Sequence, residues 1–133
     1  MATAKFSAKK KRVVVYLRTA TTQNDGSDNF EARVERIKKK IAEQHPDWTI
    51  VGVYGDKGVS GSSKNRPEYG KMTMDAQKGG FDAIVTESIP MFMRNTAEFI
   101  EDTRKLKSVG VEVYFSRESL STTDNEAICV IVT

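Results

Sequence analysis

Short runs rich in β-branched and aromatic residues alternate along the chain with segments whose apolar residues recur at helical spacing. The run at 13–17, Val-Val-Val-Tyr-Leu, is too short for a helix and apolar on both faces, which is typical of a buried strand in a parallel sheet. Similar runs follow at 48–54, 83–85 and 111–115. This alternation predicts an α/β fold with three layers, in which helices cover both faces of a mostly parallel sheet of about four to five strands.

The segments between these runs predict helices. Asp28 and Glu31 have the spacing of a capping box. The helix that they open is expected to end near Gln44, because a proline two residues later disfavours helical geometry in the residue before it. Two further helices are predicted over 67–78, which opens on a proline, and over 96–109, which is followed by a glycine.

The composition narrows the class of protein. The single cysteine, Cys129, excludes a disulfide framework, and with a single histidine it leaves no ligand cluster for zinc. No stretch approaches the ~18 consecutive apolar residues of a membrane span, and residues 1–12 lack the apolar core of a secretory signal. We therefore expect a cytoplasmic protein with no metal site, no cofactor and no membrane anchor.

The net charge of +3 is concentrated at the start of the chain. Residues 1–12 hold five of the 21 basic residues and no acidic one, which leaves 16 basic residues against 18 acidic ones in the remainder. We therefore expect a basic, flexible tail at 1–12 and a folded domain at 13–133. A solvated terminus is one interpretation of the tail, and contact with DNA phosphates is the other. The contacting residues would then be Lys9, Lys10, Lys11 and Arg12.

Arginines stand where the loops that follow the predicted strands begin or end. Arg18 comes directly after the first strand, Arg66 closes the second loop and Arg94 closes the third. Because functional groups gather at the carboxyl ends of parallel strands, these three guanidiniums are expected to share one site. Several fixed, forked donors suit recognition of a phosphodiester. The alternative is that each arginine lies on the surface beside its own carboxylate.

Four segments in the same order resemble the serine site-specific recombinases, the resolvase and invertase family. Residues 16–21 resemble the family's Tyr-x-Arg-Val-Ser-Thr opening, and 56–67 resemble its Asp-x-Gly-x-Ser-Gly motif with the following Arg-Pro. Residues 81–96 are similar to its third block, and 110–123 to the strand that leads into a Ser-Thr-rich loop. The glycine- and serine-containing loop is closer to the large-integrase and transposon branch than to the smallest resolvases.

The resemblance implies phosphoryl transfer on DNA, without a metal or another cofactor. In the family a serine hydroxyl attacks the phosphodiester and becomes joined to the 5′-phosphate, and the subunits of a tetramer then exchange strands. Transferred to this sequence, the phosphate-binding positions are Arg18, Arg66 and Arg94. The supporting positions, which would order the site and its loops, are Tyr16, Asp56 and Ser60.

The sequence departs from the family at positions that carry the chemistry. The nucleophile position is Ala20, and a methyl group cannot attack phosphorus. Met91 stands at the position of a family arginine, and Glu87 at that of a basic residue. Thr19 has a hydroxyl, but adjacent side chains in an extended segment point in opposite directions. Its hydroxyl would therefore point away from the place of the family nucleophile at position 20. Residues 91–93 form an apolar patch that either packs locally or contacts another protein.

Two functions remain open. The first is a catalytic-domain fragment of a serine recombinase that is inactive because Ala20 stands at the nucleophile position. The second is a non-catalytic, DNA-associated module that regulates or oligomerises with an active recombinase. In the family the segment corresponding to 127–132 opens a long dimerisation helix, so we expect a truncated chain with weak or absent self-association. The full-length protein would be a homodimer or a tetramer on DNA.

Overall fold

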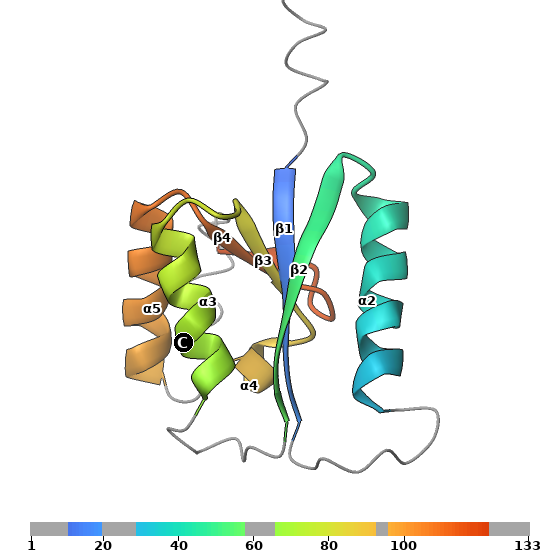
Figure 1. The fold of residues 1–133 in the computed structure, drawn as a ribbon, viewed down its shortest axis with the longest axis horizontal. Helices are drawn as coiled ribbons and strands as arrows, with labels where there is room; N and C mark the ends of the chain where they lie inside the picture. Colours follow the sequence, from blue (N-terminus) through green and yellow to red (C-terminus); the bar gives the residue numbers. More distant parts are fainter. Residues whose placement is uncertain (1–10, 20–28, 58–65, 93–95, 123–133) are drawn as a thin grey trace, which may run out of the picture.

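The computed structural model describes residues 11–19, 29–57, 66–92 and 96–122. They form one five-stranded sheet with the order β2-β1-β3-β4-β5 (Figure 1). Neighbouring strands in this sheet are parallel, except that β4 and β5 are antiparallel. The strands are β1 (Lys11–Thr19), β2 (Trp48–Lys57), β3 (Ala83–Thr86), β4 (Glu112–Phe115) and β5 (Leu120–Ser121). The helices are α2 (Phe30–Gln44), α3 (Pro67–Gln77), α4 (Ile89–Phe92) and α5 (Thr96–Ser108).

The three layers predicted from the sequence are present. In Figure 1 α2 lies on one face of the sheet, and α3 and α5 lie side by side on the other. β1 is central, with β2 on one side and β3 on the other, and its residues 13–17 are buried. This explains why that run is apolar on both faces, since a central parallel strand contacts helices from either side.

β1 begins earlier than predicted. Lys11 and Arg12, which we had placed in a flexible tail, extend β1 and pair with Trp48 and Thr49 of β2. Their side chains also have fixed partners, because Arg12 contacts Asp82 and Lys11 forms an ion pair with Glu112. Sequence analysis missed this because the acidic partners lie more than 60 residues further along the chain. Residues 1–10 are outside the described part of the chain.

α2 has the predicted end but a different start. Its N-cap is Asn29, whose side-chain Oδ1 accepts a hydrogen bond of 2.8 Å from the Ala32 amide. The predicted capping box of Asp28 and Glu31 was therefore wrong by one residue: an asparagine side chain caps the helix as well as an aspartate does, and it is Asn29 that makes the bond. The helix ends at Gln44 as predicted, and Val34, Ile37 and Ile41 form its buried side.

The opposite face holds a cluster of aromatic rings in edge-to-face contact. Its members come from β1, α3, α4, α5 and β4, and they are Tyr16, Tyr69, Phe92, Phe99 and Phe115. Met91 and Phe92 of the predicted apolar patch are 7% and 2% exposed, so these two residues pack locally. Met93 lies outside the described residues.

The loop predicted after β4 contains the short strand β5, which pairs with Tyr114 and Phe115. The hairpin turns through Ser119, the only non-glycine residue with a positive φ (55°) in the described part of the chain. The apolar run at 127–132 lies outside the described residues. Within the described ranges, no helix is both long enough and apolar enough to cross a bilayer.

Candidate active site at the carboxyl edge of the sheet

Two of the three predicted arginines meet at the carboxyl ends of the strands. Arg18 is the penultimate residue of β1, and Arg66 immediately precedes α3. The Arg18 Nε donates to the Met91 carbonyl at 3.2 Å, and the Arg66 Nη2 donates to the next carbonyl, that of Phe92, at 3.1 Å. The short helix α4 therefore holds both guanidiniums on consecutive carbonyls. Arg94 and Ala20 lie outside the described residues.

Arg66 lies between two aromatic rings. Its guanidinium carbon is 4.4 Å from the centre of the Tyr69 ring and 5.2 Å from that of Tyr16. Its Nε also donates to the Tyr16 hydroxyl at 3.0 Å. Contacts with ring faces and neutral oxygens fix the orientation of a guanidinium without cancelling its charge. Within the described residues no carboxylate forms an ion pair with Arg66.

Asp56, at the end of β2, ties this arrangement to the start of α3. Its carboxylate is 2% exposed and accepts hydrogen bonds from the Tyr16 hydroxyl at 2.8 Å and from the amides of Glu68 and Tyr69 at 3.0 and 3.1 Å. The N-cap residue, Arg66, makes no side-chain capping bond. Asp56 thus caps α3 from a neighbouring strand and places a negative charge at the positive end of the helix.

The two tyrosines beside Arg66 stay protonated. Burial raises the pKa of Tyr16 far above its usual range, the Asp56 carboxylate adds to that, and Arg66 opposes it. Burial likewise raises the pKa of Tyr69, and Asp102 adds to the effect. A neutral Tyr16 can donate to Asp56 and accept from Arg66 at the same time. The positive charge of Arg66 is therefore not cancelled by a phenolate.

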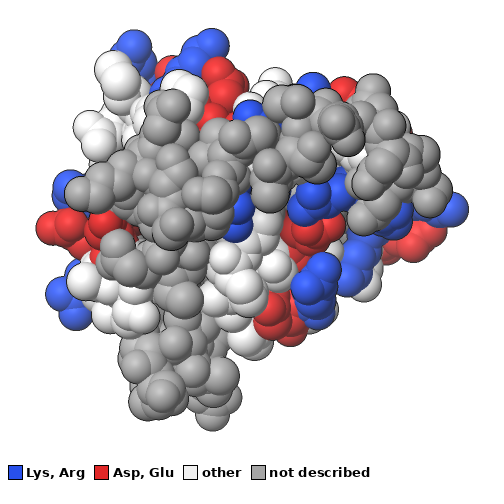
Figure 2. Space-filling view, turned by 90° about the horizontal axis from the view of Figure 1, so that it is seen from below, with Lys and Arg blue, Asp and Glu red and all other residues white. Residues whose placement is uncertain are grey.

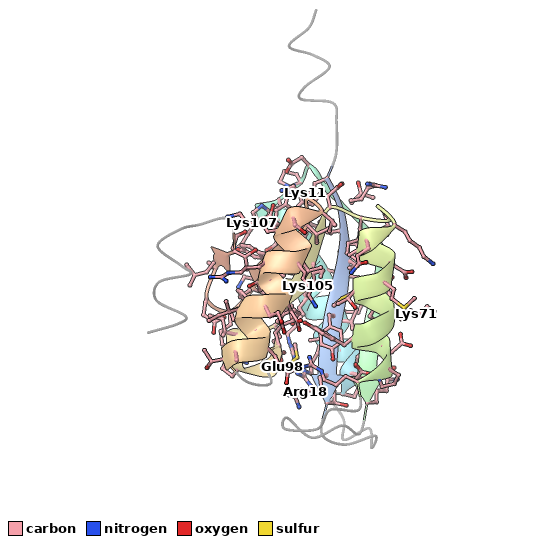
Figure 3. All side chains as sticks on the ribbon, turned by 90° about the vertical axis from the view of Figure 1, so that its left-hand side faces the viewer. Lys11, Arg18, Lys71, Glu98, Lys105 and Lys107 are labelled. Carbon is pink, nitrogen blue, oxygen red and sulfur yellow. The ribbon has the colours of Figure 1, made fainter. Side chains whose placement is uncertain are left out.

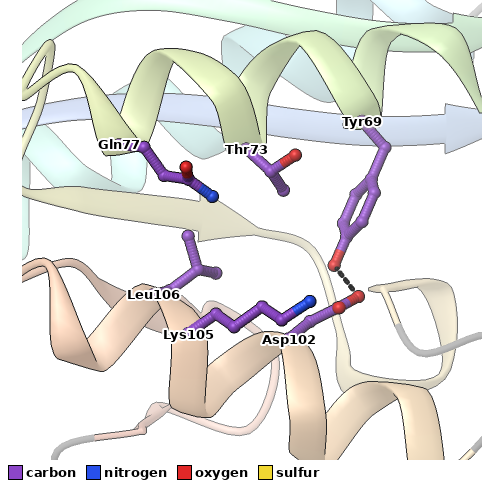
Figure 4. A pocket seen from close by; sticks show the side chains of 6 residues that line it. All are labelled: Tyr69, Thr73, Gln77, Asp102, Lys105 and Leu106. Carbon is purple, nitrogen blue, oxygen red and sulfur yellow. Dashed lines mark hydrogen bonds between the residues drawn. The ribbon is translucent and has the colours of Figure 1, made fainter.

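Tyr69 is itself held from α5. Its hydroxyl donates to the Asp102 Oδ2 at 2.7 Å, across a small cavity of about 130 Å³ between α3 and α5 (Figure 4). Thr73 and Lys105 line the same cavity. The ring that stacks on Arg66 is thereby fixed by both helices of this face.

Arg18 lies in an electropositive environment. Burial lowers its pKa, and the nearby positive charges of Arg66 and Arg33 lower it further. A guanidinium nonetheless keeps its proton at any ordinary pH, so the site holds several positive charges at close range. Figure 3 shows Arg18 at the lower end of β1, on the edge where α5 begins near Glu98. Like charges held in this way favour binding of an anion.

Met91 follows the first of the two alternatives given for the apolar patch, local packing. Its side chain is 7% exposed and turned inward. Its Sδ accepts from the Arg18 amide at 3.2 Å and lies 4.0 Å from the Thr86 hydroxyl. An unbranched thioether fills this space between the ends of β1 and β3, while its carbonyl holds Arg18.

Glu87 also has a partner that sequence analysis missed. Arg33 of α2 contacts it with both ends of its fork, Nε to Oε2 at 3.2 Å and Nη2 to Oε1 at 2.5 Å. The two side chains are only 16% and 21% exposed. The negative charge that Glu87 places at the position of a family basic residue is therefore offset by a paired guanidinium. The sequence indicates the location of Arg33 only through its position next to Val34 and one helical turn before Ile37, whose side chains are buried on the inner side of α2.

Among the described residues, Lys11 and Arg12 do not join this cluster. Lys11 and Arg12 lie at the opposite end of β1 from Arg18, about 20 Å away at ~3.3 Å per residue. Thr19 is buried at the end of β1. Ser60, Lys9 and Lys10 lie outside the described residues. In the described part of the chain, no group of three or more His, Cys, Asp or Glu side chains is arranged to hold a metal ion.

Comparison with known proteins agrees with this fold. The family model described as the resolvase N-terminal domain matches residues 13–132. A resolvase family site-specific recombinase from Streptococcus pneumoniae is 26% identical, with a TM-score of 0.76, and the match covers 92% of this chain and 83% of that one. No curated protein sequence matches this chain.

Two further solved structures share the fold at lower identity. The N-terminal catalytic domain of TP901-1 integrase is 20% identical, with a TM-score of 0.78 over 91% of this chain and 89% of that one. The C-terminal catalytic domain of ISC1926 TnpA, an IS607-like serine recombinase, is 17% identical, with a TM-score of 0.65 over 78% and 69%. These two structures share the fold. The family match over residues 13–132 shows that this chain belongs to the resolvase N-terminal domain family.

Proposed function

We propose that this domain binds a DNA phosphodiester at Arg18 and Arg66 but does not cleave it. The observation that carries the proposal is the pair of guanidiniums on consecutive carbonyls of α4, with Arg66 fixed by aromatic rings instead of by a carboxylate. Arginine forks held on a rigid scaffold match the geometry of phosphate oxygens. Arg94, four residues beyond Pro90 of α4, is proposed as a third ligand on its family resemblance.

The lost step is the nucleophilic attack. In a serine recombinase the serine oxygen bonds to phosphorus, its proton is lost, and the 3′-oxygen of the neighbouring nucleotide leaves with the bonding electrons. Ala20 has no oxygen that could form this bond. Binding of the phosphate by the arginines does not require it, so DNA binding and DNA cleavage are separable in this chain.

The second candidate function is that of a non-catalytic partner of an active recombinase on DNA. The observation in its favour is that both departures beside the site form stable contacts: Met91 is buried against Arg18, and Glu87 is paired with Arg33. Residues that pack and pair in this way maintain the fold without serving the reaction. Such a partner would enter a dimer or a tetramer and contribute DNA contacts only.

Binding and cleavage can be measured on the same DNA. A labelled nicked duplex is titrated with the protein, and a denaturing gel reports any covalent 5′-phosphoseryl adduct. We expect binding that weakens when Arg66 is changed to Gln, and no adduct at any concentration. Arg104→Gln, an exposed arginine on α5, is the matched control. Equal binding by the Arg66 and Arg104 variants would overturn the proposed phosphate site.

The partner function has its own readout. An active serine recombinase is mixed with this chain, and strand exchange is followed as the ratio of the two proteins changes. A non-catalytic subunit that enters the assembly lowers the rate in proportion to its share, whereas an isolated DNA-binding domain lowers it only when it saturates the DNA.

A further inference from the structure

A groove on the α2 side of the sheet is lined mainly by cations. It has a volume of about 300 Å³ and lies between α2 and the segments that follow β3 and β4. Arg33, Arg36 and Lys40 approach it from α2, and Arg117 approaches it from beyond β4. Its one acidic lining residue is Glu87. We call this the α2 groove.

Several side chains that line the groove have fixed partners within the protein. The Arg33 guanidinium donates to both carboxylate oxygens of Glu87, so the charge of Glu87 is compensated before any ligand enters. The Lys40 Nζ donates to the Ser116 carbonyl at 2.8 Å, a neutral partner that positions the ammonium and leaves its charge in place. Arg36 and Arg117 are exposed to solvent. Four of the lining residues are cationic and one is acidic, and this excess of positive charge gives the groove a positive field.

The groove lies near the arginine site, at the same edge of the sheet. Glu87 directly follows β3 and Arg117 follows β4, so both stand at the carboxyl edge where Arg18 lies. Arg33 belongs to the groove and is also close enough to lower the pKa of Arg18. Figure 2 looks onto this edge and shows Lys and Arg side chains interspersed with acidic ones on the right, the side of α2 in Figure 1.

We propose that the α2 groove binds a second phosphate of the same DNA strand, next to the phosphate held by Arg18 and Arg66. The inference rests on the proposed function in one respect, the identity of the polymer as DNA. A nucleic-acid strand repeats its phosphates along one backbone, so it can occupy two adjoining cationic sites at once.

The groove predicts a specific change in salt dependence. Binding of the 133-residue chain to a labelled 20-base-pair duplex is measured by anisotropy between 50 and 200 mM NaCl, with Arg36 and Arg117 both changed to Gln. Loss of one phosphate contact lowers the slope of log K against log[salt] by about 0.9, and weakens binding at low salt about threefold or more. The matched control changes Lys39 and Lys71 to Gln, two exposed lysines that do not line the groove.

A second variant gives an effect of the opposite sign. Glu87→Gln removes the acidic group, and we expect DNA binding about threefold tighter with a steeper salt slope. If the Glu87–Arg33 pair contributed only to the stability of the fold, Glu87→Gln would weaken DNA binding or leave it unchanged. Circular dichroism of each variant verifies that the fold is retained.

The outcomes separate this inference from the proposed function. Weaker binding by Arg66→Gln together with control-like behaviour of the Arg36/Arg117 variant overturns the groove and leaves the proposed site intact. The reverse pattern overturns the proposed site and leaves the groove as a nucleic-acid contact. Competition by an oligoglutamate peptide of the same charge, as strong as competition by unlabelled DNA, overturns the assignment to a phosphate.

Discussion

At the amino end of β1, Lys11 and Arg12 each contact a carboxylate, whereas at the carboxyl end Arg18 and Arg66 bond to backbone carbonyls of α4. Both ends of the strand therefore hold cations in fixed positions. They differ in what fixes them, because carboxylates cancel the charges of Lys11 and Arg12, whereas the carbonyl oxygen that holds Arg66 does not cancel its charge.

On the proposed function, this difference distinguishes cations that stabilise the fold from cations that bind a phosphate. An ion pair such as Arg12–Asp82 joins β1 to the segment before β3, and little net positive charge remains for an anion. At the other end, the buried carboxylate of Asp56 contacts Tyr16 and two helix amides. It supports the arginine site from behind without neutralising it.

The largest effect is expected from restoring the nucleophile. Ala20→Ser alone should leave cleavage near background, because Met91 stands where the family has an arginine and its side chain is turned inward. One missing preorganised donor costs about 10²–10³ in rate. Adding Met91→Arg, with dimerising sequence supplied, should recover part of the activity, measured as 5′-phosphoseryl adduct on a nicked half-site.

Because Met91 is buried against the Arg18 amide, the double variant must be compared at an equal folded fraction. Substantial adduct from Ala20→Ser alone would contradict this prediction. It would show that Arg18 and Arg66, with any contribution from Arg94, provide enough positive charge for the reaction.

The next largest effect concerns Asp56 and Asp82, the carboxylates that lie beside the carboxyl and amino ends of β1. Asp56→Ala leaves one buried and two partly buried donors without their acceptor, and we expect a loss of about 3 kcal/mol in the free energy of unfolding. Asp82→Ala removes a half-exposed partner of Arg12, so its effect should be much smaller. Urea denaturation of both variants tests the comparison. Equal losses would show that the two ends are stabilised alike.

Much of the fold could be predicted from the sequence because it depends on local patterns. The apolar run at 13–17 predicted the central buried strand, and the helical spacing of Val34, Ile37 and Ile41 predicted the buried side of α2. The start of α2 was missed because Asp28 and Asn29 are both good capping residues, and only the backbone geometry decides between them.

The proximity of Arg18 and Arg66 could be predicted from the sequence, but the contacts that hold them could not. Arg18 and Arg66 could be placed together because parallel strands end at one edge. The pairing of Glu87 with Arg33, and the inward turn of Met91, depend on contacts between elements more than 50 residues apart. No local pattern encodes such contacts, which is why the partners of Glu87 and Met91 could not be predicted.

The packing at the carboxyl edge can be tested with two glycines. A Cβ on Gly55, near the end of β2, would lie 2.3 Å from the Phe30 ring, whereas one on Gly70 in α3 would meet no atom within 4 Å. Gly55→Ala should lower the free energy of unfolding by about 1 kcal/mol as Phe30 moves aside. Gly70→Ala should raise it by about 0.5–1 kcal/mol, because alanine favours a helix interior. Thermal denaturation distinguishes the two signs.

The smallest effect is the pH dependence of the amino end. Arg12 lowers the pKa of the Asp82 carboxyl below its ordinary value of 3.8, chiefly through a side-chain hydrogen bond. A carboxyl whose pKa is lowered in the folded state stabilises the protein above its unfolded pKa, and that contribution is lost as the pH falls through the folded pKa. The difference in melting temperature between the wild type and Asp82→Asn should therefore be constant near neutrality and shrink only below pH 3.8. A difference that already shrinks between pH 7 and pH 5 would mean that another group, and not Asp82, titrates at this end of β1.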